Sequence, residues 1–166
     1  MSTFKVEIGT DAFDRGFKRL FGRTDDLSPL MQMIGETLSV STKTRIRTGG
    51  PAPDGSAYAP KSPVTLEQFL RIGEGYDTRP LNHLGHLGNL GIHHSSGRDW
   101  AMVGASPEYA AVMQFGAKQG AFGRTKRGGP VPWGDIPARP FLGLSMDDER
   151  FLLEAVEEFL MGDFGE

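Results

Sequence analysis

The sequence predicts an α+β fold in which a small, mainly antiparallel sheet packs against amphipathic helices, with long loops between the elements. Three observations support this class. Apolar residues recur at helical spacing in several separate segments, whereas the segments with strand-like alternation are short. Glycine and proline, 23 and 11 among 166 residues, are frequent enough to indicate much irregular connection. The length predicts one domain over residues 1–166.

The first predicted elements are a short strand and an amphipathic helix near the start of the sequence. Phe4, Val6 and Ile8 alternate with charged residues, which is the period of a half-buried strand. Thr10 has the side chain of an N-cap and precedes apolar residues that share one helical face. We therefore expect a first helix after Thr10.

The longest predicted helix begins directly after an N-cap at Ser28 and ends at the glycine pair 49–50. Ser28 followed by Pro29 is a typical pair at a helix start, and glycine commonly ends a helix in the left-handed conformation. Arg45 and Arg47 lie near the helix end, where cations complement the helix dipole. The dipole explains both arginines without a further role.

The middle of the chain is predicted to hold a loop, a helix, a leucine–glycine segment and a hairpin. Residues 51–63 are rich in proline and contain an Asp54-Gly55 turn, and a helix follows from Thr65. Leucines at every third position of LGHLGNLG (84–91) predict a packed helix or 3₁₀ segment whose histidines face outward. The next residues predict a hairpin across Ser96-Gly97.

The last part of the chain is predicted to hold two more helices with a long loop between them. Ser106 and Pro107 are expected to open a short helix that ends at Gly116. Residues 117–135 are rich in glycine and in cations, and they predict a flexible basic loop. Ser145 is expected to cap the final helix, whose first turn is acidic.

Two prolines stiffen the segment IPARPFLGLS, residues 136–145. Proline fixes φ and removes a backbone donor, so this segment is extended and excluded from a central strand. One hypothesis is an edge presented in ordered form to a neighbouring subunit, with Ile136, Arg139 and Phe141 as contact residues. The alternative is that the segment leads the chain back over its own sheet into the last helix.

Composition excludes several classes of function. The chain has no cysteine, which removes disulfides, thiolate nucleophiles and cysteine-ligated metals. It shows no P-loop, dinucleotide-binding glycine motif or G-x-S-x-G elbow, so we predict no enzyme and no cofactor. The net charge of −3 gives no general attraction to nucleic acid or membrane, and no apolar run has the length of a membrane span. We expect synthesis in the cytoplasm and no membrane partner.

The histidines invite a metal hypothesis. All 4 lie between positions 83 and 94, and a metal-dependent hydrolase would use His83, His86 and His93. No carboxylate lies between Asp77 and Asp99 to complete or orient such a set. Solvated histidines are therefore the favoured interpretation, and we predict no metal.

The loop 117–135 combines cations with aromatic side chains. Its cations are Lys118, Arg124, Lys126 and Arg127, and its single acid is Asp135. Phe122 and Trp133 lie among them. Such a set suits contact with phosphates and stacking on bases, so a nucleic-acid-binding accessory or assembly protein is one hypothesis. A plain solvated loop is its alternative.

The end of the chain is strongly acidic. The helix dipole explains the acids of the first turn, so the informative residues are Glu154, Glu157 and Glu158. Opposite charges in two regions of one chain suit head-to-tail contact between identical subunits. Such a contact produces a ring when it closes, so a homo-oligomeric ring is predicted.

The order of these motifs resembles a known family. PDGSAYAP (53–60), the leucine–glycine segment, MVGAS with PEYAAVMQFG, IPARPFLGLS and an acidic helix follow one another as in the virion-morphogenesis or tail-completion proteins of tailed bacteriophages, particularly Mu-like phages. The resemblance covers about Pro53 to Met161. In two departures, Tyr58 replaces the tryptophan that usually follows the PDG turn, and LGHLGNLG replaces a Leu-x-x-x-Gly-x-Leu pattern.

The resemblance implies a non-enzymatic structural protein of the virion neck, where the head meets the tail. Related tail-terminator, tail-completion and head–tail connector proteins form rings, commonly of six subunits. The implied partners are further copies of this chain and other neck and tail proteins, with non-specific contact to packaged DNA. The implied location is the virion, after synthesis in the host cytoplasm.

Overall fold

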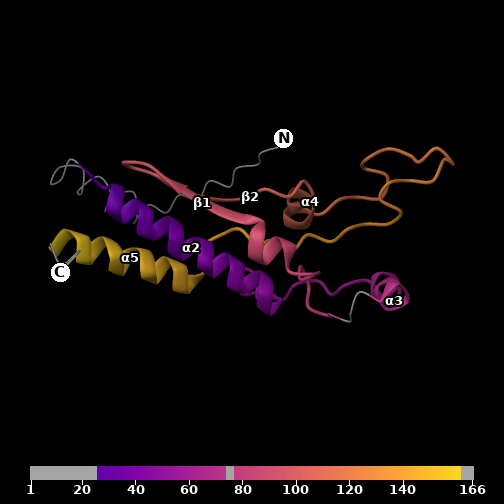
Figure 1. Ribbon diagram of the computed structural model, residues 1–166, viewed down its shortest axis with the longest axis horizontal. Coiled ribbons are helices and arrows are strands. Elements are labelled where there is room, and N and C mark those ends of the chain that lie inside the picture. The colour runs from indigo at the N-terminus through magenta and orange to yellow at the C-terminus, as the bar shows by residue number, and fades with distance from the viewer. Residues whose placement is uncertain (1–25, 74–76, 162–166) are drawn as a thin grey trace.

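The computed structural model describes residues 26–73 and 77–161 (Figure 1). Its elements are α2 (Ser28–Thr48), α3 (Pro63–Ile72), the π-helical turn η1 (His86–Leu90), β1 (Ile92–Ser96), β2 (Ala101–Ala105), α4 (Ala110–Phe115) and α5 (Met146–Met161). Helices combined with an antiparallel pair of strands confirm the predicted α+β class. The strand predicted at residues 4–8 and the helix predicted after Thr10 lie outside the described residues.

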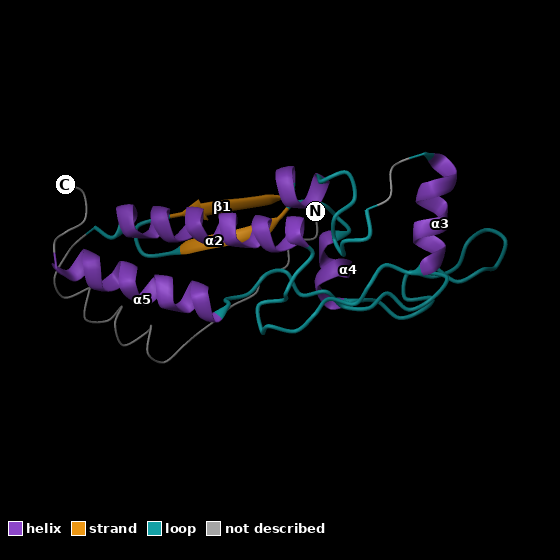
Figure 2. Cartoon of the chain, turned by 90° about the horizontal axis from the view of Figure 1, so that it is seen from below, coloured by secondary structure: helices purple, strands orange, loops and turns teal. Residues whose placement is uncertain are grey.

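The long helix α2 is the centre of the fold. The β1–β2 hairpin lies along one side of α2, and α5 lies along another (Figure 2). Leu30 and Ile34 on α2 pack with Leu152, Ala155 and Val156 on α5 in one buried cluster. Burial of a large aliphatic side chain stabilises a fold by about 1.5–3 kcal/mol. This cluster therefore holds the acidic C-terminal helix firmly against the centre of the subunit.

The predicted end of α2 is confirmed at Gly49 and its predicted start is corrected. Gly49 has a φ of 83°, and its N–H donates to the carbonyl oxygens of Arg45 and Ile46. Ser28 is not the N-cap, because the helix begins with it and Leu27 occupies the capping position. The carboxylate of Asp26 accepts the Ser28 N–H at 2.9 Å instead.

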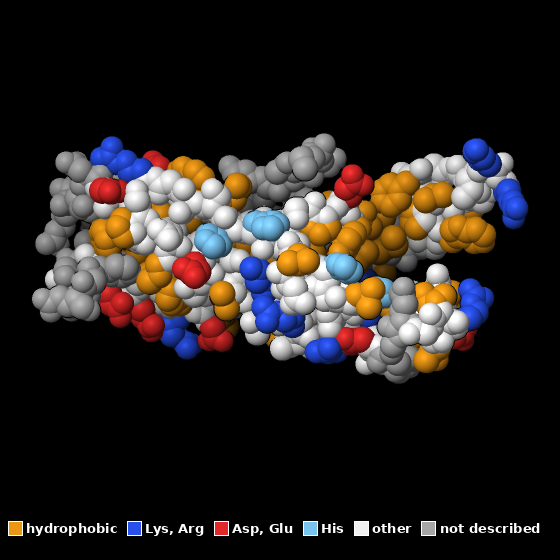
Figure 3. Space-filling view, in the orientation of Figure 1, with side chains coloured by type: hydrophobic (Ala, Val, Ile, Leu, Met, Phe, Trp, Pro, Cys, Tyr) orange, Lys and Arg blue, Asp and Glu red, His pale blue; other side chains and the backbone are white. Residues whose placement is uncertain are grey.

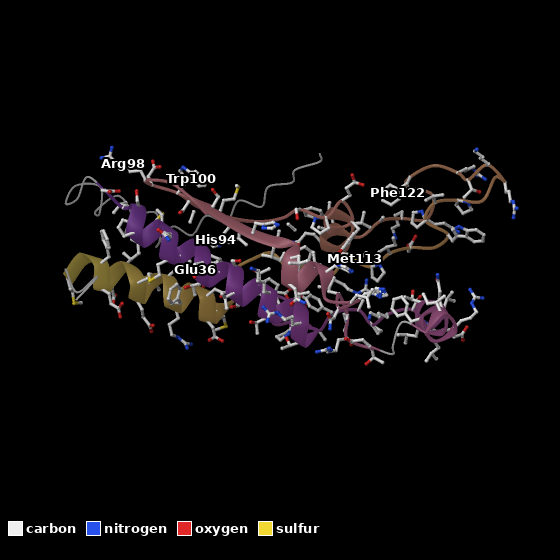
Figure 4. The ribbon with its side chains drawn as sticks, in the orientation of Figure 1. Glu36, His94, Arg98, Trp100, Met113 and Phe122 are labelled. Atoms are coloured by element: carbon white, nitrogen blue, oxygen red, sulfur yellow. The ribbon has the colours of Figure 1, made fainter. Side chains whose placement is uncertain are left out.

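The predicted hairpin is confirmed. β1 and β2 are antiparallel, with Ile92 opposite Ala105, and the Gly97 N–H donates to the Trp100 carbonyl at 2.8 Å in the turn. The ring of His94 packs on α2 (Figure 4), since a Cβ built at Gly35 would lie 3.5 Å from its Cδ2. The small residue at this point of α2 thus allows close approach of the hairpin.

The leucine–glycine segment forms a π-helical turn, and its leucines do not form the expected packed face. The Gly91 N–H donates to the carbonyl of His86, five residues earlier, at 2.9 Å. Leu87 is 2% exposed, whereas Leu84 is 61% and Leu90 is 73% exposed. The expectation is wrong because Leu84 precedes the turn, with a left-handed φ of 51°, and the turn itself directs only Leu87 into the core.

The two short helices begin at positions that differ from those predicted. α3 begins two residues before Thr65, and the Ser62 hydroxyl accepts the Thr65 N–H at 3.2 Å as an N-cap. α4 begins at Ala110 and not at Pro107, because a separate turn comes first, in which the Ala110 N–H donates to the Pro107 carbonyl. Gly116 ends α4 as predicted.

The segment IPARPFLGLS belongs to a second buried cluster. Phe141 is 0% and Leu142 is 8% exposed, and both pack with apolar residues of α2, β1 and α4. Arg139 is also buried. This corrects the assignment of Arg139 and Phe141 to an exposed contact surface. Of the two hypotheses, the structure favours the one in which the segment leads the chain back across the body into α5.

Candidate interaction site

Residues 117–136, here called the arm, project from the body of the subunit (Figure 1). At its base, Ala117 and Ile136 exchange both backbone hydrogen bonds, at 2.9 and 2.7 Å. Further out, the Phe122 N–H donates to the Val131 carbonyl at 2.7 Å. The predicted basic loop is thus two legs joined by backbone hydrogen bonds, and Ile136 is a residue of its base.

The cations of the arm gather toward its tip, at the far right of Figure 3. Lys118, near the base, pairs with Asp135 at 2.8 Å. Arg124 donates to a backbone carbonyl of the tip at 2.9 Å, which leaves its charge uncompensated. Lys126 and Arg127 are exposed, and neither makes an ion pair within the described part of the chain. The unpaired positive charge of the arm is therefore concentrated at its tip.

Two large aromatic side chains of the arm face solvent. Trp133 is 78% exposed and Phe122, labelled in Figure 4, is 57% exposed. Aromatic side chains of this size are usually mostly buried in a folded subunit. Their exposure beside cations is typical of a surface that binds another macromolecule.

The outer face of α5 is acidic and partly apolar. The exposed acids predicted for this helix are Glu154, Glu157 and Glu158. Met146, Leu153 and Met161 are 80, 49 and 74% exposed. Because these positions are seven and eight residues apart, they share one side of the helix, and we call them the α5 stripe.

The arm and α5 lie toward opposite ends of an elongated subunit (Figures 1 and 3). Acidic side chains gather over α5 at the lower left of Figure 3, and the cations of the arm tip lie at the far right. The structure therefore does not bring the two predicted charged regions together within one chain. Any contact between them must join different chains.

Arg139 anchors the segment that leads out of the arm. Its Nε donates to the Ala59 carbonyl at 2.7 Å and its Nη2 donates to the Pro60 carbonyl at 2.6 Å. The Tyr58 hydroxyl donates to the Pro140 carbonyl at 3.0 Å. Burial lowers the pKa of Arg139 and raises the pKa of Tyr58 to about 12. Arg139 and its neighbours thus fix the arm's base to the 51–63 loop.

Gln114 is a structural residue that sequence reasoning missed. Its Oε1 accepts the N–H groups of Phe141 and Leu142 at 2.9 and 3.0 Å, and its Nε2 donates to the Leu142 carbonyl at 3.0 Å. One buried amide therefore replaces a strand partner for this extended segment. The only sequence signal was the place of Gln114 in the QFG motif.

The predicted interaction of Arg45 with the helix dipole does not describe its main contacts, because Arg45 lies inside the subunit. It donates to the carboxylate of Asp148 at 3.0 Å and to the carbonyl of Phe141 at 2.8 Å. Burial opposes the charge on Asp148, yet hydrogen bonds from serines and the charge of Arg45 outweigh it and lower the pKa of Asp148. Ser145 caps α5 as predicted, since its hydroxyl accepts the Asp148 N–H at 3.2 Å. Arg45 thus joins α2, the buried Phe141 segment and α5.

A polar cluster at the base of α3 holds two loop segments together. The Lys61 Nζ donates to the carbonyls of Asp77 and Asn82, both at 2.6 Å. The Asp77 carboxylate accepts hydrogen bonds from the Arg79 guanidinium and the Asn82 amide. Hydrogen bonds and charge from Arg79 lower the pKa of Asp77 to about 2.

Replacing Asp77 with asparagine should reduce the sensitivity of the fold to acid. The folded-state pKa lies below its value in an unfolded chain, so the carboxylate contributes stability that is present above about pH 4 and is lost as the pH falls toward 2. Asp77→Asn should lower the Tm at neutral pH and flatten its decline on acidification, as measured by circular dichroism. Asp99→Asn is the control, and an unchanged decline in the Asp77 variant would contradict the assignment.

The histidines are spread over different surroundings. His83 stacks on Phe69, with the ring centroids 4.1 Å apart, and His93 Nε2 lies 3.1 Å from the Ser106 hydroxyl. His86 and His94 are exposed. Residues 26–73 and 77–161 contain no group of three histidine, aspartate or glutamate side chains placed to hold a metal ion. The structure thus gives the metal hypothesis no site within those ranges.

The described surface combines a projecting cationic arm with an acidic helix face (Figure 3). The chain belongs to the phage virion morphogenesis family, whose family model matches residues 8–161. It is 32% identical over 142 residues to Mu-like prophage FluMu G protein 2 of Haemophilus influenzae, with 86% of this chain and 84% of that protein covered. No solved structure gives a significant match.

Membership of this family confirms the resemblance seen in the motifs. It indicates a structural or assembly role in a phage and implies association with the virion. Across the described ranges, no helix combines the length and apolar character that a membrane span requires.

Proposed function

We propose that this chain is a non-enzymatic subunit of the head–tail connector of a tailed phage, acting as a tail-completion or tail-terminator protein. The observation that carries this proposal is the pair of oppositely charged surfaces at the two ends of an elongated chain in a virion morphogenesis family. A subunit with unlike ends makes heterologous contacts with its copies. Repeated around an axis, such contacts close into a ring, and we propose a hexamer.

A ring of this kind suits the place where the head meets the tail. A cyclic ring of heterologous contacts has two different faces, so it offers one set of contacts to head proteins and another to tail proteins. The family membership supports assembly as the role of the chain, and the proposal adds the neck as its location. Other neck and tail proteins are the proposed partners beyond the ring.

The test is a phage in which this gene carries an early stop codon. We expect electron micrographs to show DNA-filled heads and separate tails, with infectivity lower by at least about a hundredfold, and a plasmid-borne wild-type copy should restore joined virions. Normal, infectious particles without this protein would overturn the proposal. Complete heads without any tails would instead place the protein in tail formation before joining.

Nucleic-acid binding is a second candidate function. Phe122 and Trp133 are exposed beside cations, and such a surface can stack on bases and contact phosphates. DNA binding would weaken with salt, with a slope near −0.9 for each phosphate contact in duplex DNA. This candidate accounts for the arm alone and assigns no role to the α5 stripe.

A further inference from the structure

We infer that the arm of one subunit lies along the α5 stripe of a second copy of this chain. Phe122 and Trp133 would cover the stripe, and the cations of the arm tip would face the acids beside it. The inference rests on the proposed function, in which the chain works as an oligomer, and it names the residues of the contact. The second copy is the partner because one chain carries both matching surfaces at opposite ends.

The arm has the composition of a protein-binding surface. Trp133 and Phe122 are 78% and 57% exposed, and the arginines and the lysine of the arm tip lie between them in the sequence. Tryptophan and arginine are enriched among the residues that dominate binding energy, and they work best when a partner surrounds them. Because the two legs of the arm are hydrogen-bonded to each other, less conformational entropy is lost when it binds.

The outer face of α5 has the matching composition. The inner face of this helix is buried through Leu152, Ala155 and Val156, so a polar outer face would complete an ordinary surface helix. The α5 stripe interrupts that face with Met146, Leu153 and Met161. Methionine is flexible and adapts to aromatic rings, which suits it to receive Phe122 and Trp133.

The charges of the two surfaces are opposite, and their lengths can be compared. The arm tip contributes Arg124, Lys126 and Arg127, and the helix contributes Glu154, Glu157 and Glu158. The α5 stripe covers fifteen helical steps, or about 22 Å. The seven residue-to-residue steps from the base bridge at Ala117 to the tip bridge at Arg124 reach at most about 23 Å in a fully extended chain. Turns closed by the Ala121 N–H on the Lys118 carbonyl and by the Gly123 N–H on the Gly120 carbonyl make this leg shorter than that maximum, so the arm would cover part of the stripe.

A second copy explains more of the surface than DNA does. DNA would contact the cations and aromatic rings of the arm, and the acids of α5 would repel it. A second copy covers the aromatic rings and the stripe in one contact and pairs the charges of both. Each exposed ion pair gives only about 0.2–1 kcal/mol, so the charges would set the register and the apolar side chains would supply most of the affinity.

The test compares variants of the full chain by sedimentation and light scattering at low and moderate salt. Trp133→Ala should weaken self-association by about tenfold or more, the effect typical of a central aromatic contact. Reversal of Arg124, Lys126 and Arg127 to glutamate should also weaken it, most strongly at low salt. Reversing Glu154, Glu157 and Glu158 to lysine in that same chain should restore part of the lost association.

Each outcome decides the inference. Reversal of Lys43, Arg47 and Arg71 to glutamate is the matched control, because it makes the same change in charge outside the proposed contact and should leave association unchanged. Circular dichroism checks the folding of every variant. A monomeric wild-type chain, or arm variants that associate normally, would overturn the inference. Neither result would decide the proposed location in the neck, which the stop-codon experiment tests separately. If the arm variants associate normally but no longer shift the mobility of linear duplex DNA, a shift that weakens with salt in the wild type, that result would assign the arm to nucleic-acid binding.

Discussion

Replacing Arg45 with alanine is expected to lower the free energy of unfolding by about 3–5 kcal/mol, the usual cost of breaking a buried ion pair. The side chains of Arg45 and Asp148 are 7% and 8% exposed, so little water reaches either. Without the guanidinium, Asp148 stays in the interior with its serine hydrogen bonds alone, and the Phe141 carbonyl loses its donor. Urea unfolding followed by circular dichroism measures the loss.

Arg47→Ala is the matched control for Arg45→Ala. Arg47 lies two residues further along the same helix with an exposed side chain, so its replacement should change stability by less than about 0.5 kcal/mol. The pKa of Asp148, which is lowered in the native protein, should rise in the Arg45 variant. Equal losses from the two arginines would show that the ion pair does not hold α5 in place.

Replacing Gln114 with leucine is expected to destabilise the fold by about 3 kcal/mol or more, since each buried polar group left without a partner costs about 1–3 kcal/mol. The change keeps the size of the side chain but leaves the N–H groups of Phe141 and Leu142 and the Leu142 carbonyl without their partner. Urea unfolding gives the total loss. Hydrogen exchange gives its location, because the amides of Phe141 and Leu142 should lose protection first.

Gln68→Leu on the exposed surface of α3 is the control for Gln114→Leu. It makes the same chemical change where no buried backbone group depends on the amide, so stability should change by less than about 0.5 kcal/mol. If Gln114→Leu unfolded at the same urea concentration as the wild type, the buried segment would have to be held by packing alone.

The features that the sequence predicted well are those decided by neighbours in the chain. Gly49 ends α2 and Ser145 caps α5 because capping geometry depends on a few consecutive residues. The hairpin across Gly97 is equally local. The start of α2 was misplaced by one residue, because Asp26 offered a carboxylate two positions before Ser28 and replaced the expected serine cap.

The features that the sequence did not predict depend on distant partners. The contacts of Arg45 lie 96 and 103 residues away, and those of Gln114 lie 27 and 28 residues away. Local patterns carry no signal for such pairs, so the sequence explains Arg45 by the helix dipole and predicts an exposed Phe141. The charges of the arm and of α5 were visible in composition, but their places at opposite ends follow only from the fold.

The long reach of Arg45 sets an order of events during synthesis. Ribosomes make α2 and the arm before α5, so Arg45 stays without its carboxylate partner until residue 148 has emerged. Contacts that close such long loops form late in folding. The cationic arm is therefore synthesised before the acidic helix has docked, and a growing chain does not yet carry both surfaces of the proposed contact. If the proposed contact forms, assembly of the ring must therefore follow completion of each polypeptide.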